Sequence, residues 1–364
     1  MLLKDMYSKD FLESLGDSLK NVYGEFDIEK FMTDCLVENW DDLKLMERSN
    51  QITISLHNQL PDNFEESAVI IEKIAPQFTG LVAICLPNYV AKYGLNDWQV
   101  SMNLLEILTK YSSGEFAIRP FLIKYPEKTE AQMLDWSKSK DIDVRRLSSE
   151  GIRPRLPWGI RLKQYVEDPT VIWPILENLI YDDSEYVQKS VANNLNDISK
   201  DHPDLVIQFS KRHWGHQESS DWVINRGLRT LFKQGNPDVL SLLGYEIAAA
   251  QSIDYVQLTS NLKEVKIGGT STLNYRIYSN EQKSKPVYLG YRVHYVRKNN
   301  SDSYKDFFIK KTNLLKRDIS GSINIKWKQL STRKLYTGEH LIELLVNTIP
   351  IANVKIDLTN MLDK

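Results

Sequence analysis

The spacing of apolar side chains changes once along this chain, close to residue 254. Before that point apolar residues recur at intervals of three and four, as in segment 98–111, which is typical of amphipathic helices. After it apolar and polar residues alternate, and β-branched and aromatic types dominate, as in segment 270–279, which indicates strands. The pattern therefore predicts a helical domain over residues 1–254 and a β domain over residues 255–364.

The helices of the first domain repeat. When segment 141–150 is aligned with segment 183–194 at Val144 and Val187, Glu150 falls on Asn193, and the two segments lie 43 residues apart. A two-helix period of about 40 residues is typical of a HEAT-like α-solenoid. Such repeats bury their apolar faces against their neighbours, and the stack curves around a concave surface lined by the second helix of each pair. We expect 147–163 and 184–198 to be helices of this inner row.

The second domain contains short alternating segments separated by turn residues such as Gly268-Gly269 and Gly321. Six or seven strands in about 100 residues favour an antiparallel β-sandwich of immunoglobulin-like architecture. The expected strands are 270–279, 286–298, 305–315, 322–330, 339–347 and 351–358.

The net charge of −2 conceals an unequal distribution. Residues 257–364 hold 19 basic and 9 acidic side chains, whereas the rest of the chain holds 27 basic and 39 acidic ones. A basic small domain favours a polyanionic partner, although an ordinary solvated basic surface would give the same count. The candidates for contact with a polyanion are Lys310, Lys311, Lys316, Arg317, Lys326 and Lys328.

Several classes of function have no motif here. Two cysteines, Cys35 and Cys85, are too few for a disulfide framework or a four-cysteine metal site, and buried free thiols are expected. His213 and His216 lack a third ligand at zinc spacing. The sequence has no GxSxG elbow of a serine hydrolase and no phosphate-binding loop. The first ten residues are too charged for a signal peptide, and no apolar stretch is long enough to span a bilayer. We expect no metal, no cofactor and no membrane association.

Three acids remain as candidates for chemistry. Glu115, Glu150 and Asp197 recur on successive repeats, so all three are expected to point from inner helices into the concave groove. Arginines would partner them there, and the indole of Trp158 would attract a cation. A ligand with an anionic backbone and a cationic group would suit this site, because the arginines can bind the anion while the acids and the indole bind the cation. Alkylated DNA is such a ligand.

An ordinary structural interpretation exists for each residue. Glu150 would pair with Arg153, Trp158 would pack between repeats, and Asn194 would belong to a ladder between helices. A non-catalytic HEAT-repeat adaptor, or a DNA-binding protein without activity, is therefore the alternative.

Four blocks of the chain carry a further signal: GEFAIRPFL (114–122), VRRLSSEGIRPRLPWG (144–159), VQKSVANNLNDISKDHPDLV (187–206) and NRGLRTLFKQGNPDVLSLLGY (225–245). In these blocks the sequence resembles the AlkC family of bacterial DNA alkylation-repair glycosylases, which are relatives of the AlkD family. The resemblance covers most of the chain, and the basic β domain agrees with it, because an immunoglobulin-like appendage marks AlkC and is missing from AlkD.

The resemblance implies a monofunctional glycosylase for cationic lesions in double-stranded DNA, 3-methyladenine and 3-methylcytosine, that acts without conventional base flipping. It implies catalytic roles for Glu115, Glu150 and Asp197 and a lesion contact for Trp158. It also implies backbone-contacting or structural roles for Arg153, Arg155 and Arg229.

The remaining expectations concern charge and setting. The basic residues expected on the groove side, with the other acids elsewhere, are Arg145, Arg146, Arg153, Arg155, Arg161, Lys163 and Lys189. Of the β domain, Lys310 and Lys311 are the DNA-binding candidates we favour. The protein is expected to act as a monomer, in the bacterial cytoplasm at the nucleoid.

Overall fold

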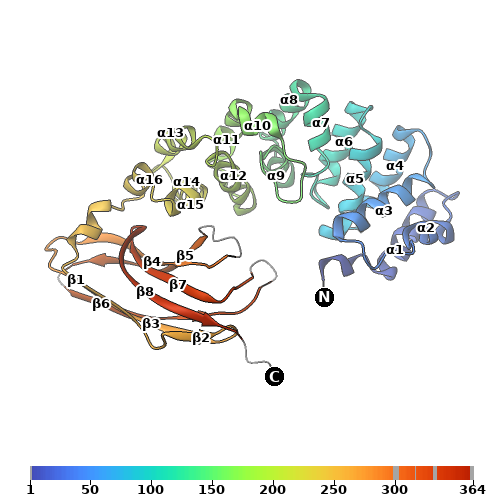
Figure 1. Cartoon of the computed structure of the whole chain (residues 1–364). Helices are drawn as coiled ribbons and strands as arrows, with labels where there is room; N and C mark the ends of the chain where they lie inside the picture. The colour runs from blue at the N-terminus through green and yellow to red at the C-terminus, as the bar shows by residue number, and fades with distance from the viewer. Residues whose placement is uncertain (1, 298–302, 316, 331–333, 361–364) are drawn as a thin grey trace. The chain divides into compact units, whose positions relative to one another are not determined.

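The computed structural model of the chain describes residues 2–297, 303–315, 317–330 and 334–360, and helices precede strands along it (Figure 1). The α-helices are α1 Lys9–Val22, α2 Ile28–Cys35, α3 Leu45–His57, α4 Phe64–Ile74, α5 Cys85–Tyr93, α6 Trp98–Leu108, α7 Arg119–Lys124, α8 Pro126–Trp136, α9 Ile142–Gly151, α10 Lys163–Glu167, α11 Trp173–Leu179, α12 Glu185–Ile198, α13 Pro203–His213, α14 Glu218–Gly227, α15 Arg229–Lys233 and α16 Pro237–Leu242. Short 3-10 turns are η1 Leu3–Met6, η2 Ala75–Gln77, η3 Leu81–Ile84, η4 Thr170–Ile172 and η5 Ile247–Ser252.

The chain forms two compact units. The helical unit comprises Met1–Val206 with His213–Gly227, and the sandwich unit comprises Ile207–Arg212 with Leu228–Lys364. Secondary structure changes from helix to strand between Ser252 and Tyr255, next to the predicted boundary at 254, but the two short helices α15 and α16 group with the strands.

Helices of the helical unit stack side by side in a curve, and on its inner side α12 lies between α9 and α14 (Figure 1). The aligned Val144 and Val187 are both buried, as the repeat requires. The predicted HEAT-like solenoid is therefore confirmed.

Helix α9 is much shorter than predicted. It begins at the N-cap Asp141, whose carboxylate accepts from the backbone N–H of Asp143, and it ends at Gly151 instead of continuing to residue 163. A Cβ at Gly151 would lie 2.6 Å from Cγ2 of Ile118, so the end of the helix packs directly on the preceding turn. Pro154 and Pro157 then prevent further helix, because proline lacks the backbone donor and clashes with the preceding turn.

The strands are β1 Tyr255–Ser260, β2 Glu264–Lys266, β3 Thr270–Ser279, β4 Lys285–His294, β5 Tyr304–Leu314, β6 Arg317–Lys326, β7 Gly338–Val346 and β8 Ile349–Thr359. They form one sheet of order β1-β3-β6 and another of order β2-β8-β7-β4-β5, with antiparallel pairing except between β2 and β8. The sandwich is confirmed, and each of the six expected strands overlaps an observed one. The bounds differ most for β4, which ends at His294 (the expected end, residue 298, lies outside the described residues), and for β6, which runs from Arg317 to Lys326 where 322–330 was expected. The prediction missed β1 and β2, because β2 has three residues and β1 shows only partial burial.

Contacts with the sandwich core explain why α15 and the segment after α16 belong to this unit. Phe232 of α15 and Tyr245 both pack edge-on against Tyr288 of β4. Asn347, in the β7–β8 turn, is fully buried; its side chain accepts from the Tyr288 N–H at 2.8 Å and donates to the Glu246 carbonyl at 2.7 Å. These contacts attach the segment before β1 to strand β4 and to the β7–β8 turn.

Two further expectations can be compared with the structure. Cys35 and Cys85 are both free and buried, and burial raises the pKa of each thiol to about 12. None of the helices in the described residues has the length and apolarity needed to cross a membrane.

We predict that Asn347→Gly destabilises the sandwich unit by about 1–3 kcal/mol, because it removes the buried side chain that accepts from the Tyr288 N–H and donates to the Glu246 carbonyl. Glycine keeps the left-handed backbone of this position (φ 50°), so strain does not contribute. The neighbouring Thr348→Gly (φ 69°), which removes no hydrogen bond among the described residues, is the control. Equal urea midpoints for the two variants would contradict the assignment.

Candidate nucleic-acid site

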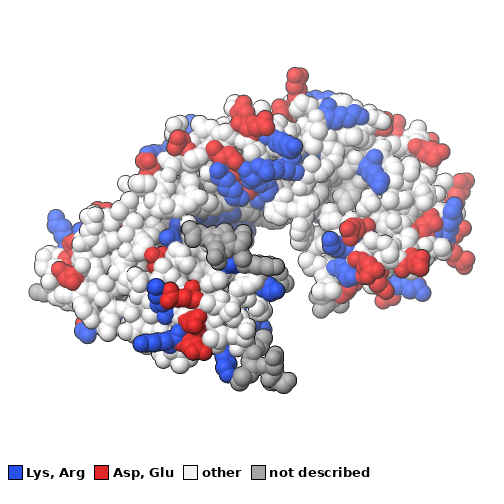
Figure 2. All heavy atoms as spheres, viewed as in Figure 1, with Lys and Arg blue, Asp and Glu red and all other residues white. Residues whose placement is uncertain are grey.

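The three predicted acids are joined by bridging arginines. Glu150 lies in the last turn of α9, and Asp197 lies near the end of the neighbouring α12. Glu115 lies in the turn before α7 and not, as predicted, on an inner helix. Figure 2 shows acidic and basic side chains gathered together over the α9–α12 part of the helical unit.

Arg153 connects the two acids of α9 and α12. Its Nη1 donates to Glu150 Oε1 at 2.5 Å, and its Nε and Nη2 both lie 2.9 Å from Asp197 Oδ2. Lys200 closes this end of the network by donating to Asp197 Oδ1 at 3.0 Å. The side chains of Glu150, Arg153 and Asp197 are each less than a tenth exposed, so this is a buried ion-pair cluster.

Arg146 of α9 makes the second bridge. Its Nη1 pairs with Glu115 Oε2 and donates to Ser113 Oγ at 2.6 Å, while its Nη2 lies 3.7 Å from Glu150 Oε1. Its guanidinium also lies over the ring of Tyr186, 4.8 Å from the centroid. Acids and bases therefore alternate from Glu115 to Lys200.

The acids hold these arginines firmly in the charged state. Burial by itself would lower the pKa of the Arg153 guanidinium, but Glu150 and Asp197 outweigh it and the pKa is raised. Arg146 follows the same rule, with Glu115 and Glu150 as the opposing charges. Removing either arginine would leave buried carboxylates uncompensated, which typically costs about 3–5 kcal/mol.

One oxygen of each glutamate stays available. Among the described residues, neither Glu150 Oε2 nor Glu115 Oε1 accepts a hydrogen bond, whereas both oxygens of Asp197 are engaged. A hydrogen bond from a ligand to Glu115 Oε1 or Glu150 Oε2 would therefore not break an ion pair of the network.

Trp158 lies on the loop between α9 and α10. It is 65% exposed, and its φ of 64° is in the left-handed region, which costs a residue with a Cβ about 1–2 kcal/mol. The loop is held by backbone bonds from Gly159 to Leu156 and from Leu162 to Pro154. A strained, fixed backbone that presents an indole to solvent is typical of a contact residue and excludes packing between repeats as its role.

Most of the predicted groove cations are paired with acids, so the expectation that the other acids lie elsewhere was wrong. Arg145 pairs with Asp182 at 2.6 Å, Arg155 with Asp201 at 2.7 Å, and Lys189 with Glu185 at 3.0 Å. Asp182 and Asp201 lie in the segments that precede and follow α12, and Glu185 lies one helical turn before Lys189. Arg161 and Lys163 are exposed and make no ion pair among the described residues.

The other predicted DNA-binding residues lie in the sandwich unit. Arg229 is the first residue of α15 and is partly buried. Lys310 and Lys311 lie on β5, an edge strand; Lys311 is exposed, and Lys310 lies over the Tyr275 ring. Lys326 and Lys328 are exposed, Lys316 lies outside the described residues, and Arg317 begins β6.

The structural interpretation of Asn194 is confirmed. Asn194 donates to the Ser149 carbonyl at 2.9 Å, which is the expected ladder between α12 and α9. His213 contacts Tyr181 and Glu177, at 2.8 and 2.9 Å. Within the described ranges no group of three or more His, Cys, Asp or Glu is arranged to hold a metal.

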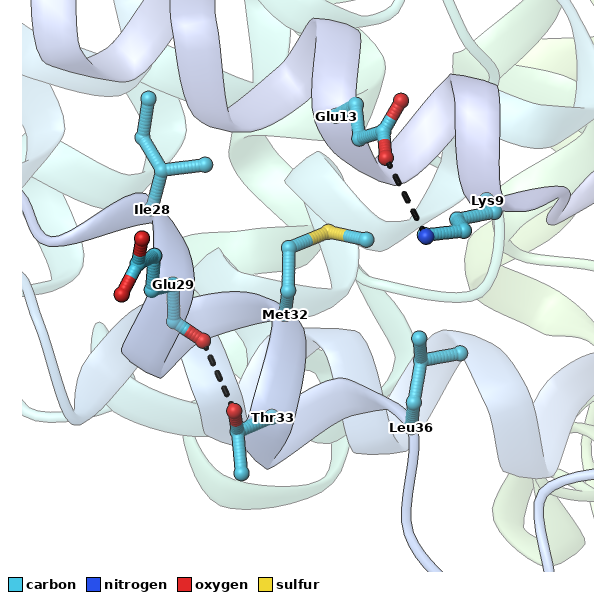
Figure 3. Close-up of a pocket in the computed structure, with 7 residues that line it drawn as sticks. All are labelled: Lys9, Glu13, Ile28, Glu29, Met32, Thr33 and Leu36. Atoms are coloured by element: carbon cyan, nitrogen blue, oxygen red, sulfur yellow. Dashed lines mark hydrogen bonds and ion pairs between the residues drawn. The ribbon is translucent and has the colours of Figure 1, made fainter.

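Cavities occur both beside the network and far along the solenoid from it. One of about 270 Å³ is lined by Glu115, Arg146, Tyr186, Phe116 and neighbouring residues. Another, of about 580 Å³, lies between α1 and α2, where Met32 and Leu36 form an apolar floor beside the Lys9–Glu13 ion pair (Figure 3). It shares no residue with the acid network.

Sequence reasoning missed Lys200 and Arg119. Lys200 is three residues after Asp197, in the turn that follows α12, so its spacing was a usable signal. Arg119 is a single charge inside the apolar segment 116–122, and a fully buried arginine was not expected there.

Comparisons with known proteins cover both units. A family model described as "DNA alkylation repair enzyme" matches residues 110–231, and one described as "Uncharacterised protein YhaZ, C-terminal Ig-like domain" matches residues 254–360. The uncharacterized protein YhaZ of Bacillus subtilis is 40% identical over 346 residues, which are 95% of this chain and 96% of that protein. The Pseudomonas fluorescens alkylpurine DNA glycosylase AlkC, bound to DNA with an abasic site analog, superposes with a TM-score of 0.93 at 32% identity, over 99% of this chain and 100% of that one.

We predict that Trp158→Gly is more stable than Trp158→Ala by about 1 kcal/mol, because only glycine is unstrained at this φ. Both variants remove the same exposed ring, so the comparison isolates the backbone. Unfolding free energies from urea titration measure the difference, and the reverse order would show that the loop relaxes when the indole is removed.

Proposed function

This chain belongs to the AlkC family of DNA alkylation repair enzymes, and we propose that it is a DNA glycosylase that hydrolyses the N-glycosidic bond of cationic alkylated bases in double-stranded DNA. The substrates we propose are 3-methyladenine and 3-methylcytosine, and the product is an abasic site that starts base excision repair. The observation that supports this most is the cluster in which Arg146 and Arg153 bridge Glu115, Glu150 and Asp197.

The charge of the lesion determines what the enzyme must supply. Methylation at a ring nitrogen makes the base a cation and hence a good leaving group, so no general acid has to protonate it. The N-glycosidic bond breaks with its electron pair going to the base, which becomes neutral, and positive charge develops on the sugar, as in glycoside hydrolysis. Water adds to C1′, and its proton passes to a carboxylate and then to solvent.

The carboxylates stabilise the developing sugar cation. They interact more strongly with the transition state than with the ground state, which is the requirement for catalysis. Glu150 is nearly buried, so little water screens its charge, and its Oε2 has no partner among the described residues. We propose that this oxygen acts beside the sugar and orients the attacking water. Asp197 keeps both oxygens on Arg153 and Lys200 and holds the cluster in place.

Trp158 would contact the lesion from its exposed position on the α9–α10 loop. The face of an indole attracts a cation by about 0.5–2 kcal/mol. We propose that the base is not rotated into a conventional deep pocket, since the proposed chemistry acts on the sugar. Neutral lesions would be poor substrates, because no group is assigned to protonate them.

Exposed cations would bind the phosphates. Arg161, Lys163 and Lys311 make no ion pair among the described residues, which leaves them available for phosphate contact, whereas Arg153 is occupied by the acids. We propose that the protein acts as a monomer on chromosomal DNA, without a metal or cofactor.

We predict that Glu150→Gln and Asp197→Asn each lower the single-turnover release of 3-methyladenine by about 100-fold or more. Glu150→Gln removes the charge proposed to act beside the sugar, and Asp197→Asn weakens the ion pair with Arg153, which holds Glu150 in place. Affinity for a duplex with the neutral tetrahydrofuran abasic-site analog should change only a few-fold. Glu130→Gln, which alters a partly buried acid of α8 outside the network, is the control and should keep the wild-type rate.

Methylated DNA incubated with the purified protein, followed by analysis of released bases, also separates the competing functions. An adaptor or an inactive DNA-binding protein would release no base. Wild-type rates in both acid variants would rule out the assigned roles while leaving glycosylase activity intact.

We predict that Lys311→Ala weakens DNA binding and lowers the slope of log K against log salt by about 0.9, the value for one phosphate contact. Lys355→Ala, an exposed lysine of the same unit that pairs with Glu339 at 2.8 Å, should leave the slope unchanged. If both variants show the same slope of log K against log salt, Lys311 does not contact a phosphate.

A further inference from the structure

Arg119 is the most deeply buried charge beside the acid network. It begins α7, its exposure is 0%, and it follows the turn that carries Glu115. Burial first, and then the nearby Arg153, lower its pKa to about 10 against the opposing pull of Asp197, Glu115 and Glu150. The guanidinium is therefore still protonated at neutral pH.

Its partners are backbone carbonyls from two different segments. Nη1 donates to the carbonyl of Gly151 at 2.7 Å, and Nε donates to the carbonyl of Ile160 at 2.5 Å. Gly151 follows Glu150 at the end of α9, and Ile160 lies two residues after Trp158. One rigid side chain thus joins the helix end that carries an acid to the loop that carries the indole.

The chain around this contact is shaped to fit the arginine. A Cβ at Gly159 would lie 3.2 Å from both Cδ and Nε of Arg119, so the residue after Trp158 packs directly on the guanidinium stem. The Gly151 carbonyl is at the negative end of α9, where a cation is favoured. A loop in which Trp158 is strained needs such an anchor to keep its conformation.

Stability alone does not account for a charge at this position. Among the described residues Arg119 makes no ion pair, and its Nη2 has no hydrogen-bond partner. A buried charge without a carboxylate partner is costly, and an apolar side chain of similar volume would fill the same space at lower cost.

We infer that Arg119 is a positioning residue that sets the place of Trp158 relative to Glu150. This inference rests on the proposed glycosylase function. The planar fork of a guanidinium spans two carbonyls at fixed geometry, which an ammonium group cannot do. Loss of the bridge would leave both side chains present but misplaced, and a misplacement of about 1 Å is enough to cost roughly 100-fold in rate.

The variant that tests this is Arg119→Met, with Arg48→Met as its matched control. Arg48 is also buried and also donates to backbone carbonyls, those of Trp40 and Lys4 at 3.2 and 3.0 Å, but it lies on α3 and contacts no residue of the network. Both variants remove a buried guanidinium from the helical unit, so both are expected to lower its melting temperature.

We expect Arg119→Met to lower the single-turnover rate of 3-methyladenine release at saturating enzyme at least tenfold, while Arg48→Met keeps the wild-type rate. Both are compared below their melting temperatures. In the Trp158→Ala background the further effect of Arg119→Met should be less than about twofold, since both changes remove the same contact. Arg119→Lys should stay slow. Equal rates in Arg119→Met and Arg48→Met, multiplicative losses with Trp158→Ala, or full activity in Arg119→Lys would each overturn the inference.

Hydrogen exchange separates this inference from the proposed function. Arg119→Met should speed amide exchange in residues 152–162, and Arg48→Met should not. Unchanged exchange in that segment would refute the anchor even in an active enzyme. If the wild-type protein releases no base, the proposed function and the catalytic role of Arg119 are both refuted. If Arg119→Met nevertheless exchanges faster than Arg48→Met in residues 152–162, Arg119 still anchors the loop structurally.

Discussion

The helical unit depends on the way Arg153 holds two acids from neighbouring repeats. Glu150 and Asp197 lie on adjacent helices and are both almost completely buried. At low effective dielectric, two such anions sharing one cleft would repel each other by several kcal/mol. A guanidinium donates to both at once, and Arg146 repeats the arrangement toward Glu115. The solenoid brings Glu150 and Asp197 together, because α9 and α12 pack against each other.

The same cluster explains how a site with so many charges remains stable and still leaves a reactive oxygen. Three carboxylates are balanced by Arg146, Arg153 and Lys200, so the buried charge is largely compensated. The pairing uses Oε1 of Glu150 and leaves Oε2 without a partner among the described residues. The loop with Trp158 has the opposite character, since its backbone is strained and its ring is exposed. Ion pairs hold the acid cluster in place, and backbone hydrogen bonds hold the Trp158 loop in place. The proposed chemistry needs both the acids and the indole.

Much of this could be predicted from the sequence, and the errors have identifiable causes. Periodicity was enough for the solenoid and the sandwich, because each has a distinct spacing of apolar residues. The three acids were found through the repeat and the family resemblance. The end of α9 was missed, although Pro154 and Pro157 were visible, because the apolar spacing continued past them. The pairing of Arg145 with Asp182 and of Arg155 with Asp201 could not be derived, since a sequence does not show which residues of separate repeats meet. The Glu185–Lys189 pair could have been found, because its four-residue spacing within one helix is a usable signal.

The central claim is that the bridged acids stabilise a sugar that becomes positive. It is tested most directly by the affinity of the protein for two duplexes, one with a cationic 1-azaribose abasic analog and one with its neutral tetrahydrofuran counterpart. The account predicts tighter binding of the cationic duplex, and loss of that preference when Glu150 is changed to glutamine. Equal affinity for the two duplexes in the wild-type protein would contradict it.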